Sequence, residues 1–396
     1  MFRPIPVTPA VQWVGALDFD IRVFDVVMRT DNGTTYNAYL VKGGEKTVLI
    51  ETVKEAFFGE FRERLEEAAG LPEIDYIVIN HAEPDHSGSL ARLLPLAPKA
   101  VVLGTGAALA FAKKVANADF PSRAVKDGET IDIGGMELRF IHAPFMHWPD
   151  TMFTYIPEIG ALFTCDAFGC HYCDARLFND AIEGDFLGAY RYYFDNIMGP
   201  FKPHVLAALE KLRGLDVRTI CNSHGPVIRE NPRNYIEMYR EWAAPVKNDP
   251  PRAAIAYVSA YGYTKKLAGK IRDGLAGEGV EALLFDLVTC DREEVKNEIA
   301  RADGLLLGSP TIVGEALPPV WDILSGLNPI IHKGKKAGVF GSYGWSGEAV
   351  PNLEARLKQL KLETPVAGLM VRFNPSGEEL AKAEEFGREF GRSLKQ

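Results

Sequence analysis

Four side chains that can bind a metal ion lie within six consecutive residues of the sequence. The segment His81-Ala82-Glu83-Pro84-Asp85-His86 follows the apolar run at 75–80, and it offers two imidazoles and two carboxylates. Because Pro84 prevents a regular helix, we expect a loop between a strand and a helix that begins near Ser87, where ligands can converge. A solvated loop that caps this helix would explain one carboxylate but not two histidines and two acids. We therefore interpret the segment as part of a metal site.

Three further candidate ligands follow other apolar runs, each of which is a predicted strand. They are His147, Asp166 and His224. A single histidine after a strand is more often structural than a ligand. Three such residues at the ends of successive strands, together with the hexapeptide, make a purely structural role for all of them the weaker interpretation.

A second set of residues that could do chemistry lies later in the chain, in the loop Ser259-Ala260-Tyr261-Gly262-Tyr263-Thr264. The loop follows an apolar run and leads into a helical pattern. Its backbone N–H groups and the hydroxyls of Ser259 and Thr264 can therefore surround a phosphate dianion. It matches neither the Walker loop nor the Gly-x-Gly-x-x-Gly fingerprint. For this loop taken alone, an ordinary helix N-terminus with a Thr cap is the alternative.

Two more loops make a flavin site the better interpretation. They are Gly308-Ser309-Pro310-Thr311-Ile312 and Gly341-Ser342-Tyr343-Gly344-Trp345-Ser346-Gly347. Both resemble the loops that flank the isoalloxazine ring in flavodoxins. An aromatic ring such as Tyr343 or Trp345 can stack on the flavin, while Gly344 lets the backbone approach N5. Ligands of open parallel sheets bind at the carboxyl ends of strands, where all three loops are expected, so the sequence predicts bound FMN.

The elements that must position these residues differ between the two parts of the chain. Up to about residue 245, short strands in series, for example at 21–28 and 35–41, and interspersed helices indicate an α+β or layered αββα fold. Beyond it, about five apolar runs alternate with helical patterns, which indicates right-handed βαβ units and a doubly wound α/β domain of flavodoxin-like size. The prolines within 243–251 mark the boundary, so we predict domains at 1–248 and 249–396.

Composition and charge exclude several classes of protein. The chain has 396 residues, with 53 acidic against 44 basic residues and a formal net charge of −9. This balance gives no basic footprint for nucleic acid or an anionic membrane. No apolar run approaches membrane-spanning length, and the N-terminus lacks a signal-peptide pattern. The five scattered cysteines argue against a secreted disulfide scaffold. We expect a cytoplasmic multidomain protein with no nucleic-acid or membrane partner.

The order of the candidate ligands, His-x-Glu-x-Asp-His and then His, Asp and His, resembles the metallo-β-lactamase-like domain of flavodiiron proteins (A-type flavoproteins). The segments 34–40, 147–150 and 166–169 are also similar to this family, and the resemblance covers essentially the whole chain. It implies a metallo-β-lactamase-like αββα sandwich followed by a flavodoxin-like doubly wound parallel sheet. Zinc hydrolases of the first fold usually carry histidine where this sequence has Glu83. The added carboxylate gives four histidines and three carboxylates, a set that suits iron better than zinc.

The resemblance also implies which residues hold which ion of an oxo- or hydroxo-bridged iron pair. One iron would be held by His81, Glu83 and His147, the other by Asp85, His86 and His224, with Asp166 as the bridging ligand. None of the five cysteines is needed as a ligand.

Two more residues are implied to line the pocket beside the irons. Family members carry a histidine and a tyrosine at places that match His171 and Tyr193, and these are the candidate proton donors. For Tyr193, an aromatic helix face is an equally open interpretation. Many members also carry a histidine after the phenylalanine that corresponds to Phe24, where this chain has Asp25. An acid there can alter the proton supply or the preference between gases.

The function implied by the resemblance is that of an oxidoreductase that reduces O2 to water, NO to N2O, or both, at a diiron centre fed by FMN. Two ferrous ions and a reduced flavin hold four electrons, enough to take O2 to two waters, whereas coupling two NO molecules needs two electrons. In the family the flavin and the diiron centre of one subunit are far apart, so a head-to-tail homodimer or a dimer of dimers is expected. Rubredoxin, another flavoprotein or a reduced deazaflavin are the candidate electron donors.

Two alternatives from other classes stay open. A dinuclear zinc hydrolase fused to a flavodoxin-like electron-transfer module would hydrolyse esters or thioesters without electrons, and Glu83 argues against it. An electron-transfer protein with a vestigial metal site would exchange electrons with a partner but consume neither gas. The complete set of ligand types argues against this second alternative.

Overall fold

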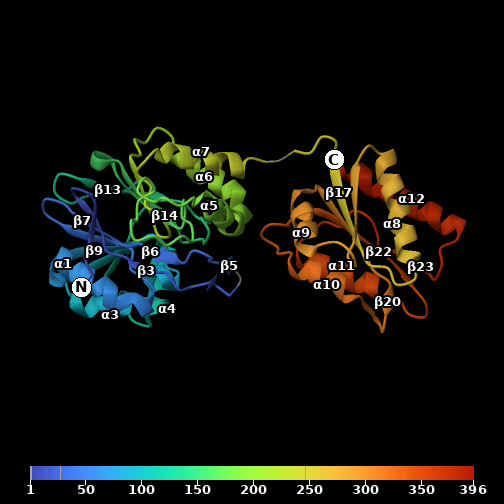
Figure 1. Ribbon diagram of the computed structural model, residues 1–396, viewed down its shortest axis with the longest axis horizontal. Helices are drawn as coiled ribbons and strands as arrows, with labels where there is room; N and C mark the ends of the chain where they lie inside the picture. The colour runs from blue at the N-terminus through green and yellow to red at the C-terminus, as the bar shows by residue number, and fades with distance from the viewer. Residues whose placement is uncertain (1, 27, 246) are drawn as a thin grey trace. The chain divides into compact units, whose positions relative to one another are not determined.

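The structure, a computed structural model, describes residues 2–26, 28–245 and 247–396. It divides into two units, Met1–Ala244 and Pro245–Gln396 (Figure 1). The division falls inside the proline-containing segment 243–251, slightly before the predicted boundary at residue 248. Each unit has its own hydrophobic core. No helix in the described part of the chain is long and apolar enough to cross a bilayer.

Two main sheets form the first unit. The seven-stranded sheet has the order β1 (Ile5–Thr8), β2 (Val11–Trp13), β7 (Tyr39–Lys42), β8 (Thr47–Ile50), β9 (Ile74–Ile79), β10 (Val101–Gly104) and β11 (Ser122–Ala124). The five-stranded sheet has the order β12 (Thr130–Asp132), β13 (Glu137–His142), β14 (Met152–Ile156), β15 (Ala161–Cys165) and β16 (Thr219–Asn222). The pairs β8–β9, β9–β10 and β15–β16 are parallel, so the carboxyl ends of paired strands lie at the same edge of each sheet.

Strand β8 shows how the sequence builds two buried faces. Leu49 belongs to the core cluster that includes the helices, whereas Val48 and Ile50 belong to the cluster that joins the two sheets. Successive side chains of a strand point to opposite faces, and here both faces are covered. The cluster between the sheets also holds Tyr39 and Phe163, whose ring centroids are 5.4 Å apart.

Helices cover the outer faces of the two sheets. Helices α1 (Phe58–Ala68) and α4 (Gly106–Ala116) lie on one side of the unit, and α5 (Leu187–Tyr193), α6 (Lys202–Lys211) and α7 (Pro232–Ala243) lie on the other (Figure 1). This order of layers confirms the predicted αββα sandwich.

The single strands predicted at 21–28 and 35–41 are each two shorter strands. They are β4 (Val23–Phe24), β5 (Met28–Arg29), β6 (Thr34–Tyr36) and β7. Between β4 and β5 the chain turns at Asp25 and Val26, whose φ values are 48° and 67°. A strand cannot continue through two residues in this left-handed region, so the first prediction is wrong in its length.

The second unit contains one five-stranded parallel sheet. Its order is β18 (Glu281–Asp286), β17 (Arg252–Tyr257), β19 (Gly304–Gly308), β22 (Lys336–Tyr343) and β23 (Leu369–Arg372). The first strand along the chain, β17, therefore lies between the second and the third, which is the flavodoxin-like strand order. The strand order reverses at β17, and a ligand of such a sheet binds beside that point.

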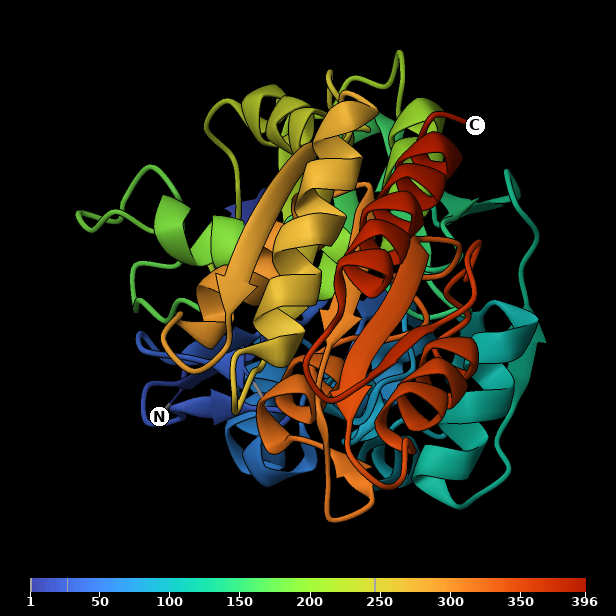
Figure 2. The same ribbon diagram turned by 90° about the vertical axis from the view of Figure 1, so that its right-hand side faces the viewer.

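Alternate residues of β17 face two different layers of helices. Ala254 and Ala256 pack in the cluster that includes α9 (Arg292–Arg301), α10 (Pro318–Ser325) and α11 (Ala349–Gln359), whereas Ala253 and Ile255 pack with the other two helices. These are α8 (Tyr263–Gly277) and α12 (Gly377–Leu394), which lie side by side across the sheet (Figure 2).

Two glycines let α8 and α12 approach closely. A Cβ atom on Gly274 of α8 would collide with the backbone oxygen of Glu384, and one on Gly387 of α12 would collide with that of Ile271. The helices can pack at this distance only because no side chain stands at either position.

Candidate metal and flavin sites

The hexapeptide that carries four candidate ligands bridges a strand end and a short helix. It begins two residues after β9, and Pro84 is the first residue of helix α2 (Pro84–Ser87), with Glu83 at the N-cap. The prediction of a helix that begins only near Ser87 is therefore wrong. Proline has no N–H to lose at the first helical position, so it starts this helix instead of preventing it.

The seven predicted ligands come together in two adjoining groups. The first group is His81, Glu83, His147 and Asp166, and the second is Asp85, His86 and His224. All seven are contributed by chain segments that follow strands: β9 precedes the hexapeptide, β13 precedes His147, β15 precedes Asp166, and β16 precedes His224.

Asp166 faces both groups with different oxygens. Its Oδ2 lies 3.6 Å from Nε2 of His81 and 3.5 Å from Nε2 of His147. Its Oδ1 lies 3.3 Å from Nε2 of His86 and 3.4 Å from Nε2 of His224. A carboxylate placed in this way can join two cations.

The other carboxylates each serve one group. Glu83 Oε2 is 3.0 Å from Nε2 of His81 and 3.3 Å from Nε2 of His147. Asp85 Oδ2 is 3.0 Å from Nε2 of His224. All four imidazoles thus direct the same ring nitrogen toward carboxylate oxygens.

The residues present fit a pair of metal ions. Asp85 Oδ1, His86 Nε2 and Asp166 Oδ2 are buried and have no hydrogen-bond partner among the described residues. Burying such groups unpaired is costly, and a cation among them would remove the cost. The donors are four imidazole nitrogens and three carboxylates without a thiolate, a set that suits iron.

Further side chains fix the orientation of the candidate ligands. The Nδ1 of His81 is 3.2 Å from each oxygen of the Asp150 carboxylate, and Nδ1 of His224 donates to the backbone oxygen of Thr35 at 2.7 Å. A hydrogen on Nδ1 leaves the lone pair of Nε2 free for an ion. Behind His86, the Glu51 carboxylate lies 3.8 Å from Nδ1 and accepts the backbone N–H of Asn80.

Sequence reasoning assigned no role to Asp150, Thr35 or Glu51. For Asp150 a signal existed, because it ends the segment 147–150 that resembles the family. For Glu51 the signal was an acid at the end of an apolar run, which is weak without knowledge of the neighbouring strand. A backbone oxygen such as that of Thr35 has no sequence signal.

Electrostatics within the cluster favour charged carboxylates and charged imidazoles. Burial alone would raise the pKa of Asp166, but the charge of His86 and the neighbouring imidazoles of His147 and His224 hold it well below its usual range. Burial opposes protonation of His147, yet the neighbouring carboxylates of Asp166 and Glu83 raise its pKa to about 10. Metal binding would therefore displace protons from the imidazoles.

His171 and Tyr193, the two residues predicted to line the pocket beside the irons, both lie beside the cluster of seven candidate ligands. The Tyr193 hydroxyl donates to Oδ1 of Asp166 at 2.7 Å, so the tyrosine is more than part of an aromatic helix face. His171 shares a hydrogen bond of 2.9 Å with Thr34 Oγ1, and its ring lies 5.3 Å from that of His224. Burial, together with the charge of His224, lowers the pKa of His171 to about 3.

Asp25 lies close enough to the cluster to interact with it electrically. Partial burial, followed by the charges of Glu83 and Asp85, raises the pKa of the Asp25 carboxyl. Its neighbour Phe24 packs on the His171 ring with centroids 4.4 Å apart.

The three predicted flavin loops meet at one end of the second sheet. They follow β17, β19 and β22, whose parallel pairing brings their carboxyl ends together. Thr264 Oγ1 and Ser342 Oγ are 2.9 Å apart, which links the first loop to the third. The Ser309 backbone N–H donates to the oxygen of Phe340, which links the second loop to β22 just before the third loop.

The first loop has a free helix N-terminus at its centre. Gly262 adopts φ 81° and precedes Tyr263, the first residue of α8. Ser259 Oγ accepts the backbone N–H of Lys265, so this hydroxyl orders the loop. The N-terminal N–H groups of α8 suit an anion such as a phosphate.

The second and third loops differ in how their predicted residues are placed. Thr311 and Ile312 form β20 (Thr311–Ile312), which pairs with β21 (Glu315–Ala316), while Ser309 and Pro310 are buried beneath. In the third loop Trp345 is 87% exposed, and Tyr261 of the first loop is 82% exposed, so both rings are free to contact a planar ligand.

The glycines of the third loop have a packing role that the sequence did not indicate. A Cβ on Gly344 would lie 2.9 Å from the Phe373 ring, and one on Gly347 would collide with Met370. Ser346, between them and half-buried, continues the loop toward α11.

The fold and these two sites define a class of two-part redox protein, with an αββα sandwich that brings two groups of metal-binding side chains together and a flavodoxin-like unit. Comparison with known families supports this class. Residues 34–225 match the ODP family beta lactamase model, and residues 255–387 match the flavodoxin model.

Similar proteins extend the match over nearly the whole chain. The type A flavoprotein fprA of Rhodobacter capsulatus is 45% identical over 393 residues, covering 97% of this chain and 90% of its own length. The flavo-diiron protein FprA2 of Clostridium acetobutylicum is 40% identical, covering 96% and 97%. The nitric oxide reductase of Moorella thermoacetica is 39% identical, covering 98% of both chains.

Among solved structures, the rubredoxin oxygen:oxidoreductase of Desulfovibrio gigas is similar with a TM-score of 0.75. It is 29% identical in sequence and covers 99% of each chain. The chain described here belongs to the type A flavoproteins, the flavodiiron protein family.

Proposed function

We propose that this protein is a flavodiiron oxidoreductase that reduces O2 to water, NO to N2O, or both. The observation that carries the proposal is the position of Asp166, whose two oxygens face two groups of imidazole and carboxylate ligands in a chain that also has a flavodoxin-like unit. Relatives named nitric oxide reductase and rubredoxin oxygen:oxidoreductase support both substrates.

The ligand roles that we propose follow the two groups of side chains. His81, Glu83 and His147 would hold one iron, Asp85, His86 and His224 the other, and Asp166 would bridge them. When bound, the irons supply electrons and open coordination positions for the gas.

The chain's own residues orient this centre and supply protons beside it. Asp150 holds the ring of His81, and Thr35 holds that of His224. We propose Tyr193 and His171, which border the ligands without belonging to either group, as proton donors. Because the pKa of His171 is lowered to about 3, its ring is neutral near pH 7 and would pass on a proton from a ring N–H.

In the second unit, we propose that the three loops hold FMN. Its phosphate would bind in the first loop, at Ser259, Tyr261, Gly262, Tyr263 and Thr264. Its ring would lie between Ser309, Pro310, Thr311 and Ile312 on one side and Ser342, Tyr343, Gly344, Trp345, Ser346 and Gly347 on the other. The two exposed aromatic rings, Tyr261 and Trp345, support this arrangement.

We propose a reduced carrier as electron donor, either rubredoxin, another flavoprotein or a reduced deazaflavin. The name of the Desulfovibrio relative supports the first. We also propose a head-to-tail homodimer or a dimer of dimers. The exposed apolar side chain of Val313, beside the second flavin loop, supports an interface there. Five free cysteines support a reducing, cytoplasmic location.

One experiment tests the function directly. The purified protein is assayed for iron, zinc and FMN, reduced without air, and then mixed with O2 or NO in separate reactions. We expect two iron ions and one FMN per chain and rapid consumption of at least one gas. Zinc in place of iron, with ester hydrolysis and no gas consumption, would contradict the proposal.

A further inference from the structure

A cavity of about 320 Å³ in the first unit reaches from solvent to the side chains that border the metal cluster. Its lining includes the exposed residues Arg29, Asp31 and Gly188 and the buried residues His171 and Tyr193. Since one cavity touches both exposed and buried residues, it joins the surface to the inside of the unit.

The inner wall of this cavity is in direct contact with candidate ligands. Tyr193 donates its hydroxyl hydrogen to Asp166 at 2.7 Å, and the His171 ring lies 5.3 Å from the ring of His224. A molecule that reaches this wall therefore has only one layer of side chains between itself and the cluster.

One polar atom at the inner wall has no partner in the protein. The Nε2 of His171 is buried and lacks a hydrogen-bond partner among the described residues, although its Nδ1 is bonded to Thr34. A buried ring nitrogen without a protein partner is normally satisfied by water or by a ligand. Water or a small ligand that enters the cavity can therefore form a hydrogen bond with this nitrogen.

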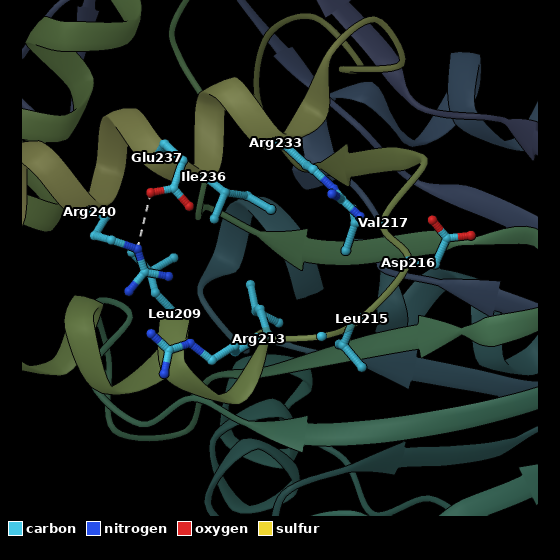
Figure 3. A pocket seen from close by; sticks show the side chains of 11 residues that line it. Leu209, Arg213, Leu215, Asp216, Val217, Arg233, Ile236, Glu237 and Arg240 are labelled. Carbon is cyan, nitrogen blue, oxygen red and sulfur yellow. Dashed lines mark hydrogen bonds and ion pairs between the residues drawn. The ribbon is translucent and has the colours of Figure 1, made fainter.

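A larger cavity elsewhere in the unit does not reach the candidate metal ligands. It measures about 570 Å³ and lies between α6 and α7, with an apolar floor and arginines at its rim (Figure 3). Its Arg240 is paired with Glu237 at 3.2 Å, and none of its lining residues belongs to the metal cluster.

We propose that the cavity lined by His171, Tyr193 and helix α5 is the passage by which the diatomic substrate and product water move between solvent and the metal cluster. Gly188 and Ala189, both on α5, are among the residues that line it. This inference rests on the proposed function, because it presumes that the cluster binds a gas.

Gly188 is the position at which the passage can be narrowed without disturbing the fold. A Cβ added there meets no atom within 4 Å, so a larger side chain at this lining position does not collide with the rest of the unit. Replacing glycine in a helix also favours the helical state. Gly59 of α1 is a matched control, since it is helical and equally open but does not line the cavity.

The test measures azide binding to the air-oxidised, iron-loaded protein by stopped-flow absorption, without turnover. A narrower passage slows entry and exit alike, whereas a change in the site alters the equilibrium constant. For Gly188→Leu we expect the association and dissociation rates to fall together by about tenfold, with Kd unchanged. Gly188→Ala should show a smaller decrease, and Gly59→Leu should match the unmodified protein.

Either of two results would contradict the proposed passage. One is that Gly188→Leu binds azide at the rate of Gly59→Leu with the same iron content. The other is that only the dissociation rate and Kd change. Absence of iron or of gas consumption in the unmodified protein would instead refute the proposed function, so the two failures are distinguishable.

Discussion

The carboxylate of Asp150 holds the imidazole of His81 from behind, with both oxygens 3.2 Å from Nδ1. The same carboxylate accepts the backbone N–H of Ala82 at 2.8 Å, so Asp150 fixes the ring and the peptide that follows it. Both Asp150 and His81 are fully buried. A ligand held in this way reaches its metal without a cost for ordering the ring.

Replacing Asp150 should therefore weaken metal binding without removing any ligand. We expect Asp150→Asn to lower iron affinity by about 10- to 100-fold, because the amide cannot orient and polarise the ring as a carboxylate does. Iron affinity is measured by competition with a chelator. Asp216→Asn, an exposed acid in the same unit, is the control, and equal iron affinity in both variants would contradict this role.

Removal of a carboxylate ligand should impair the metal site but leave FMN bound. Glu83→Ala and Asp166→Ala should each abolish O2 and NO consumption, because a buried group of imidazoles loses its anionic partner. The second unit has its own core, so both variants should stay yellow with bound FMN. Iron analysis, the visible spectrum and gas assays check this outcome. Normal turnover in either variant would refute the diiron assignment.

After iron removal, the free energy of unfolding should decrease as the pH becomes alkaline. In the metal-free protein, hydrogen bonds to carboxylates outweigh burial and raise the pKa of His147 to about 10 and that of His224 to about 9, from 6.5. These raised values stabilise the fold fully below pH 6.5, and this stabilisation is lost as the pH rises through 9 and 10.

Thermal unfolding followed by circular dichroism checks this dependence. The metal-free protein should unfold at a lower temperature near the alkaline end of that range than at neutral pH. The iron-loaded protein should show a smaller difference, because the ions replace the protons. An equal dependence in the two forms would show that the imidazoles do not hold iron.

Removal of aromatic rings near the third loop should weaken flavin binding. We expect Trp345→Ala and Tyr343→Ala together to raise the Kd for FMN by about 30-fold and to shift its reduction potential, since stacking contributes about 1 kcal/mol per ring. Fluorescence titration of the FMN-depleted protein gives the Kd. Phe2→Ala, another exposed aromatic residue, is the control. Unchanged affinity and potential would contradict the stacking assignment.

Two glycines of α8 should respond differently to replacement by alanine, because only Gly274 packs against α12. Gly274→Ala should destabilise the second unit by about 1–3 kcal/mol, because the new methyl group collides with the backbone of Glu384. Gly269→Ala, where a Cβ meets nothing within 4 Å, should stabilise it by about 0.5–1 kcal/mol. The temperature of FMN release reports both changes, and similar shifts in the two variants would contradict the close packing.

The candidate ligands could be predicted from the sequence because their chemistry is concentrated. The hexapeptide puts four ligand types in six residues, and Asp166 and His224 follow apolar runs. Their grouping came only from the resemblance to the family, because no spacing along the chain shows how the ends of β15 and β16 approach the end of β9 in the other sheet. Asp150 and Glu51 lie near the Nδ1 atom of a ligand imidazole, and no spacing along the sequence predicts such a contact.

The positions at which elements begin were less predictable than the elements themselves. Pro84 was expected to prevent a helix, but at the first helical position its ring is tolerated, and the helix starts there. The strand expected at 21–28 ends at Asp25, because that residue adopts a left-handed conformation that sequence patterns rarely reveal.

The origin of the ligands in different sheets has a mechanical consequence. His81 follows a strand of the seven-stranded sheet, whereas Asp166 and His224 follow strands of the five-stranded sheet. Ions bound among them would act as a cross-link between the two halves of the sandwich, in a chain whose cysteines are all free. Such a cross-link closes long loops, as a disulfide does, so the metal-loaded unit should resist proteases that cut the metal-free one.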